Sequence, residues 1–144
     1  MSFKNTTLDI RTGDGIDDTL LEGLYYTAND GTQDCAPVGG TTDGLSVPRA
    51  VINIIPPYGG DWFSGVLHDS AYRDQLQKLD VETNQWIPAS LPKPACDLLI
   101  LEALASQGVS LIERETIYKA VSLFGDDSFN QDRGASLKAD TSPK

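Results

Sequence analysis

The sequence predicts an α+β domain, in which a small N-terminal antiparallel β-sheet precedes a bundle of about three helices. A turn sequence, Asn29-Asp30-Gly31, separates two short segments of β-strand character. The second half of the chain contains stretches with the apolar period of amphipathic helices. A chain of 144 residues can enclose a single hydrophobic core. We therefore expect one globular domain over residues 1–125 and a polar C-terminal tail over 126–144, either flexible or docked on a partner.

The N-terminal third contains the predicted sheet. Residues 6–11 alternate polar and apolar side chains, as a half-buried strand does. The segments 24–28 and 32–36 flank the Asp-Gly turn and are predicted to form a hairpin. Residues 37–49 are rich in Gly, Thr and Ser, which predicts an ordered loop with unusual backbone dihedrals.

The first predicted helix follows a short apolar segment, residues 50–55, and a pair of prolines. It runs from about Trp62 to Leu79, and Asp61 is its expected N-cap. The stretch after it, residues 80–92, has no helical period and is long for a simple connection. We expect a small hairpin or a flap there.

Two more helices are predicted in the last third of the chain. Pro94 lies at an early position of the second helix, and Gly108 ends it. Ser110 and Glu113 have the spacing of a capping box, which starts a third helix that extends to about Phe124.

The composition argues against several classes of function. The formal net charge is −10, whereas affinity for nucleic acid depends largely on clustered Lys and Arg. The sequence has neither a signal-peptide pattern nor an apolar run of about 18 residues. We therefore expect no transmembrane segment, and we expect the newly synthesised protein to be in the cytoplasm of the host. Cys35 and Cys96 fit no metal or redox spacing and are predicted to be buried free thiols.

Chemistry is expected where the first two helices meet. On the first helix, one stripe at helical spacing contains His68, Tyr72, Leu76 and Leu79. Because the stripe ends in leucines, we expect it to face the core. On the second helix, Asp97 lies on an apolar stripe with Ile100, Leu101 and Leu104. A carboxylate there needs a partner because an unpaired buried charge costs several kcal/mol. His68, the only histidine of the chain, is the predicted partner.

Such a pair can activate water. A carboxylate on one imidazole nitrogen fixes the tautomer and raises the basicity of the other nitrogen. Asp69 is expected at the edge of the buried face, where it could bind a hard cation such as calcium with loop carbonyls as further ligands.

Simpler interpretations stand beside this one. Asp97 could be favoured only by the helix dipole, Asp69 and Arg73 could be an (i, i+4) pair, and an inward histidine is often only a core residue. The loop also has two interpretations. It is either plain turn chemistry or the wall of a site, formed by Thr42, Asp43, Gly44, Ser46 and Arg49.

Three segments of the chain resemble the DUF1353 family of uncharacterised, mostly phage and prophage proteins. They are Ala36-Pro-Val-Gly-Gly-Thr-Thr-Asp-Gly-Leu-Ser-Val-Pro-Arg49, Leu67-His-Asp-Ser-Ala-Tyr72 and Ala95-Cys-Asp97. The resemblance covers about residues 20–125. It implies a phage or prophage setting and brings no established activity.

A weaker resemblance is to phospholipase A2, especially the domain inside parvovirus capsids, whose site also has His-Asp-x-x-Tyr on one helix and Asp on the next. It implies that His68 is the base, Asp69 the calcium ligand, Asp97 the residue that orients His68, and Tyr72 a supporting hydrogen-bond partner. The glycine-rich calcium loop of that family is absent. Thr42-Asp43-Gly44 lies at a comparable distance before the histidine, which makes Asp43 a second candidate ligand.

Two hypotheses of function follow. The first is a phage-encoded accessory protein that hydrolyses an ester or another component of the host envelope. The second is a non-enzymatic tail or head protein, in which the same cluster only stabilises the fold. Both hypotheses place the chain in or near the virion. The expected partners are other virion proteins or a component of the host envelope, and the chain could form an oligomer within a particle.

Overall fold

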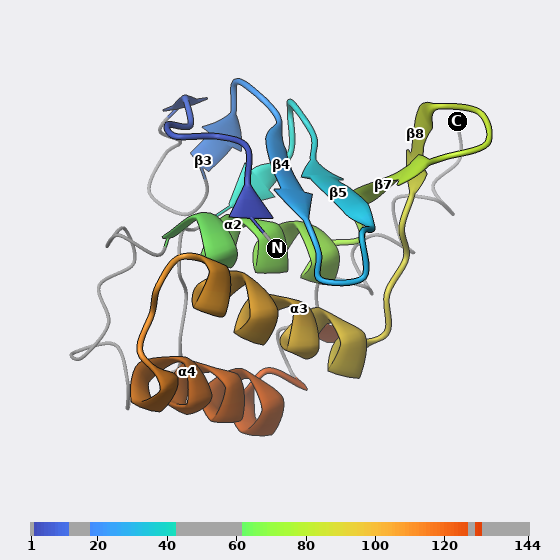
Figure 1. The fold of residues 1–144 in the computed structure, drawn as a ribbon. Helices are drawn as coiled ribbons and strands as arrows, with labels where there is room; N and C mark the ends of the chain where they lie inside the picture. The colour runs from blue at the N-terminus through green and yellow to red at the C-terminus, as the bar shows by residue number, and fades with distance from the viewer. Residues whose placement is uncertain (1, 12–17, 43–61, 127–128, 131–144) are drawn as a thin grey trace.

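The computed structural model describes residues 2–11, 18–42, 62–126 and 129–130. It confirms the predicted α+β class: in the described residues, antiparallel strands at the N-terminus precede three helices, and a further β-hairpin lies between the first and second of these helices. In Figure 1 the largest sheet lies over α2 (Trp62–Tyr72), α3 (Lys93–Ser106) lies beneath α2, and α4 (Leu111–Phe124) is farthest from the sheet. Helix α3 therefore packs between the other two helices.

The larger sheet has five antiparallel strands in the order β1-β4-β5-β7-β8. Strands β4 (Leu24–Thr27) and β5 (Gln33–Ala36) form the hairpin that the Asn-Asp-Gly turn predicts. Gly31 has a φ of +89°, a conformation that glycine adopts without strain. Strand β1 (Ser2–Phe3) pairs with the outer side of β4.

The smaller sheet contains β2 (Ile10–Arg11), β3 (Asp18–Leu20) and β6 (Thr41–Thr42), in that order. The strand predicted over residues 6–11 is confirmed only at its end. Just before this segment, the side-chain amide of Asn5 donates to Gly23 O and accepts from Tyr25 N, both at 3.0 Å. These side-chain bonds join the two segments together with a main-chain bond from Lys4 N to Tyr25 O at 3.0 Å.

The predicted end of the first helix is wrong. Helix α2 ends at Tyr72, not at Leu79. Asp74 has a φ of +58°, and its N–H bonds Ala71 O at 3.3 Å while Gln75 N–H bonds Ser70 O at 2.8 Å. This pair of bonds is the Schellman ending, here with aspartate in the position that usually holds glycine.

The chain beyond this ending forms a hairpin instead of more helix. Strand β7 (Gln77–Asp80) pairs with β5 and with β8 (Gln85–Pro88), so the expected hairpin after the first helix begins earlier than predicted and extends the N-terminal sheet. Leu76 is buried, but it lies in the connection after the helix, and Leu79 is only half-buried on β7. The predicted helical stripe is therefore correct only at His68 and Tyr72.

The other two helices agree closely with the sequence. Helix α3 has Pro94 at its second position, and Gly108 follows its end with a φ of +77°. At the start of α4 the Ser110 hydroxyl accepts a hydrogen bond from Glu113 N at 3.2 Å, as the capping box predicts.

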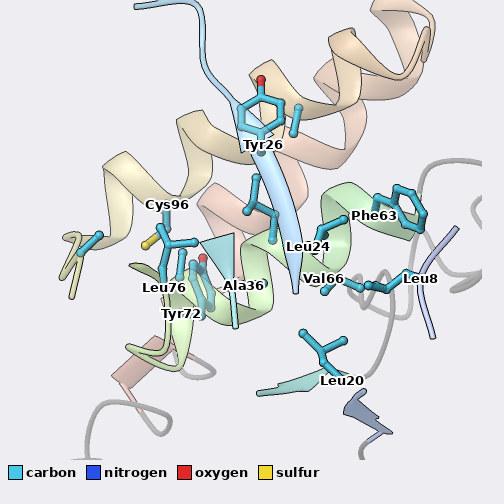
Figure 2. Close-up of a cluster of buried hydrophobic side chains, with 14 residues drawn as sticks. Leu8, Leu20, Leu24, Tyr26, Ala36, Phe63, Val66, Tyr72, Leu76 and Cys96 are labelled. Carbon is cyan, nitrogen blue, oxygen red and sulfur yellow. The ribbon is translucent and has the colours of Figure 1, made fainter. Parts of the chain in front are cut away.

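The core lies between the sheets and the first two helices. Figure 2 shows Leu24 and Tyr26 of β4 above Val66 of α2, with Cys96 of α3 at one end of the cluster. Cys35 and Cys96 are free thiols and both are buried, as predicted. In the described part of the chain, no helix has the length and apolar character that crossing a membrane requires.

Candidate functional site

A histidine and an aspartate meet between α2 and α3. His68 Nε2 lies 3.0 Å from Asp97 Oδ1, and the two residues are only 5% and 2% exposed. Both side chains face inward, as the helical stripes predict. Because α3 begins at Lys93, Asp97 lies in the second turn of that helix, where the helix dipole has little effect. Its position is therefore better explained by its contacts.

Tyr72 is a second residue of α2 that contacts Asp97. It lies one turn after His68, and its hydroxyl donates to the same oxygen, Asp97 Oδ1, at 2.6 Å. The two rings are in contact, with centroids 4.0 Å apart. Tyr72 thus contacts both the carboxylate and the imidazole and helps to hold them in place.

Lys93 is the member of the cluster that the sequence analysis missed. Its Nζ is 2.7 Å from Asp97 Oδ2, 2.9 Å from Val121 O and 3.2 Å from Ser122 O. Asp126 Oδ1 is a further neighbour at 3.3 Å. The signal in the sequence was the (i, i+4) spacing of Lys93 and Asp97 on a helix.

These contacts keep the Asp97 carboxylate ionised. Burial raises the pKa of Asp97, but hydrogen bonds from His68, Lys93 and Tyr72 outweigh this effect and hold the pKa below its ordinary value. Burial and the bond to Asp97 raise the pKa of Tyr72, so its hydroxyl stays protonated. Burial lowers the pKa of Lys93, but its contacts with Asp97 and Asp126 outweigh this and raise it. The ammonium therefore stays charged.

The network assigns the proton on the imidazole. Asp97 is ionised and can only accept, so His68 Nε2 must carry the proton of the 3.0 Å bond. In the neutral ring, Nδ1 then has the free lone pair. It makes no hydrogen bond to any other residue in the described part of the chain. This is the arrangement in which a histidine can accept a proton from water.

Asp69 lies at the edge of the pair, beside the start of the Gly-Thr loop. It is partly exposed, and its Oδ2 accepts a hydrogen bond from Thr42 Oγ1 at 2.7 Å. Thr42 is fully buried. The neighbouring residue, Thr41, accepts a bond from Arg73 Nη1 at 2.8 Å. Side chains therefore attach strand β6 to α2 and to the residue that follows it, which places the beginning of the loop next to Asp69.

The other predicted members of the loop lie outside the described residues. These are Asp43, Gly44, Ser46 and Arg49, and the expected N-cap Asp61 lies outside them too. Among the residues that the structure describes, no group of three or more His, Cys, Asp or Glu side chains could hold a metal ion. Of the two predicted calcium ligands, Asp69 lies among the described residues and Asp43 lies outside them.

The chain that follows α4 covers Tyr72. A Cβ atom at Gly125 would lie 2.7 Å from the Tyr72 hydroxyl, so this position has no room for a side chain. The ring of Phe129 meets the Tyr72 ring edge-on, with centroids 5.3 Å apart. The first residues of the predicted tail thus contact the domain, whereas residues 131–144 lie outside the described part.

Comparison with known proteins gives a single finding. A family model described as "Protein of unknown function (DUF1353)" matches residues 19–121. This range includes β6, α2 and α3, and with them His68, Asp69, Tyr72, Lys93 and Asp97. No curated protein and no solved structure matches the chain.

Proposed function

Since the chain belongs to the DUF1353 family, whose printed description gives no function, we propose a function from the site itself: a phage-encoded hydrolase in which His68 activates water. The observation that carries the proposal is the orientation of the ring. Nε2 is bound to Asp97 at 3.0 Å, which leaves Nδ1 as the basic nitrogen. The phage setting is what the resemblance in the three sequence segments implies.

The proposed reaction is the hydrolysis of an ester. Nδ1 of His68 takes a proton from water while the water oxygen attacks the carbonyl carbon. The Asp97 carboxylate stabilises the imidazolium that forms, and Tyr72 and Lys93 hold that carboxylate in place. The imidazolium then gives its proton to the leaving alkoxide as the C–O bond breaks. The products are a carboxylic acid and an alcohol, and the base is regenerated.

The substrate class that we propose is a phospholipid or another ester of the host envelope. The order His68-Asp69, Tyr72 and Asp97 along two paired helices supports it, because this is the order in phospholipase A2. His68 and Tyr72 both bond the same carboxylate oxygen of Asp97, which supports the proposed division of roles among the three residues.

We also propose calcium as a cofactor, held by Asp69. A carboxylate at the edge of the site, next to a threonine hydroxyl, is a donor of the hard oxygen type that calcium prefers. Calcium takes about six to eight oxygens, so Asp43 and carbonyls of the loop after Thr42 would have to supply others. The ion would polarise the carbonyl of the substrate.

The test is an assay of the purified protein on phospholipid vesicles and on cell-wall material, each with calcium and with a chelator. We expect turnover with one of these substrates, and its loss in His68→Gln and Asp97→Asn. Asp69→Asn should lower turnover in the presence of calcium to the level that wild type has with the chelator. Lys119→Met, at an exposed position of α4, is the matched control. Equal turnover in His68→Gln and wild type, or no turnover on any substrate, argues against the hydrolase.

A second candidate is a non-enzymatic protein of the phage tail or head. The observation that favours it is the completeness of the network: Asp97 has three donors, and the His68 side chain is only 7% exposed. Such a network can serve to fix the packing of three helices. Its partners would be other virion proteins. Mass spectrometry of purified particles tests this location, and absence from the particles counts against it.

A further inference from the structure

We infer that Lys93 is a positioning residue of the site, which holds the Asp97 carboxylate so that it can orient His68. The inference rests on the proposed function for its meaning in catalysis. The contacts that support it are independent of any substrate.

The carboxylate is held at both of its oxygens. Oδ1 accepts from His68 at 3.0 Å and from Tyr72 at 2.6 Å, whereas Oδ2 accepts from Lys93 at 2.7 Å. Rotation about the Cβ–Cγ bond of Asp97 would move both oxygens at once. Lys93 therefore resists a rotation that would take Oδ1 away from the imidazole.

Lys93 is itself fixed. An ammonium group has three N–H donors, and four oxygens surround this one, those of Asp97, Val121, Ser122 and Asp126. The two carbonyls belong to the last turn of α4, where the carbonyl oxygens and the helix dipole attract a cation. The C-terminal end of α4 thus anchors Lys93, which anchors Asp97 in turn.

Because protein oxygens accept the N–H donors of Lys93, this residue can position Asp97 but has no catalytic role of its own. The lysine side chain is 14% exposed, and its donors are directed at protein oxygens. It has no spare donor for a substrate, and an ammonium that stays charged is not a nucleophile. Its effect on a reaction must therefore pass through Asp97.

The experiment measures how quickly the Nε2 proton of His68 exchanges with solvent. Because the chain has one histidine, its ring N–H resonance needs no assignment among others. In Lys93→Met the carboxylate loses one charge-assisted hydrogen bond, and we expect exchange of the ring proton to become roughly tenfold to a hundredfold faster. Lys93→Arg, which keeps the charge and the donors, should recover part of the protection. Lys119→Met is the exposed lysine control.

Amide exchange in the core tells positioning from simple destabilisation. If Lys93 only stabilised the fold, the ring proton and the amides of buried residues such as Leu104 and Ile117 would lose protection together. Positioning predicts a greater loss at the ring. Equal loss at both, or an unchanged ring proton, overturns the inference. If Lys93→Met does not fold, Lys93→Gln keeps donors without the charge and is measured in the same way.

The exchange measurement needs no turnover, so the two proposals fail separately. Faster ring exchange in a protein without hydrolase activity refutes the proposed function and leaves the coupling of Lys93 to Asp97 intact. Where turnover is present, Lys93→Met should lower kcat more than it changes KM, because the lysine does not touch the substrate.

Discussion

The hydroxyl of Tyr72 lies so close to Gly125 that a Cβ atom at residue 125 would be only 2.7 Å from the Tyr72 oxygen. The same hydroxyl donates to Asp97 at 2.6 Å. The end of α4 therefore limits the position of a group that holds the site together.

Gly125→Ala should displace the Tyr72 hydroxyl and weaken its bond to Asp97. The new Cβ would also press on Val121 O, so we expect a loss of about 1–3 kcal/mol in the free energy of unfolding. Urea denaturation measures it. In the Tyr72→Phe background the hydroxyl is already absent, and the added cost of the alanine should be smaller. Strictly additive losses would mean that the two residues do not compete for this space.

Asp97→Ala should destabilise the protein by about 3–5 kcal/mol, because it leaves the partly buried Lys93 ammonium and the buried His68 ring without their shared acceptor. The control is Asp126→Ala, which removes a carboxylate that also contacts Lys93 but is 70% exposed. That change should cost well under 1 kcal/mol. Thermal melting of the two variants compares them directly, and similar melting temperatures would contradict the assigned network.

The sequence predicted the helix pair well because the evidence for it is local. His68 and Asp97 each lie on an apolar stripe of their own helix, and a buried charge demands a partner. The hairpin at Gly31 and the cap at Ser110 are likewise specified by a few adjacent residues. Such signals do not depend on how distant segments pack.

The end of α2 could not be predicted in this way. Leu76 and Leu79 are three residues apart, which fits a helix, yet Leu79 belongs to a strand because Lys78 pairs with Asp34 of β5. Asp74 ends the helix in a conformation that glycine usually takes, so the stop signal was weak. Tertiary pairing decided between the two structures.

Lys93 was missed for a related reason. Its spacing to Asp97 is visible in the sequence, but a lysine in the first turn of a helix is usually solvated. Only the packing of α4 against α3 brings Val121 O and Ser122 O to its ammonium. The loop residues Asp43, Gly44, Ser46 and Arg49 lie outside the described part, so their place in the site stays a prediction.

Acid should remove the contribution of Asp97 to stability. Its pKa is lowered in the folded protein, so this contribution is complete above the ordinary value of 3.8 and is lost as the pH falls through the folded pKa. We expect wild type to be more stable than Asp97→Asn at pH 6, and the difference to shrink below about pH 3.8. Urea unfolding of both proteins between pH 6 and pH 2 is the measurement. A difference that stays constant over this range would show that the charge of Asp97 is not responsible.

A second carboxylate, Asp34 of β5, should have the opposite pH dependence. Burial and the nearby charges of Asp30 and Glu102 raise the pKa of Asp34 to about 6, although Lys78 lowers it in part. In the unfolded chain the group ionises near its ordinary value of 3.8. The folded state therefore binds the proton more tightly, and stability falls as the pH rises from about 4 to about 6.

Asp34→Asn should accordingly stabilise the protein at pH 7, because the amide resembles the neutral acid and has no charge to bury. We expect a gain of about 1 kcal/mol, less than the full pKa difference implies because solvent screens part of the charge. The gain should vanish below about pH 4, where Asp34 of wild type is neutral as well. Urea unfolding at pH 4 and pH 7 measures it, with Asp9→Asn as the control at an exposed position. If Asp34→Asn has the same effect at both pH values, packing rather than ionisation determines it.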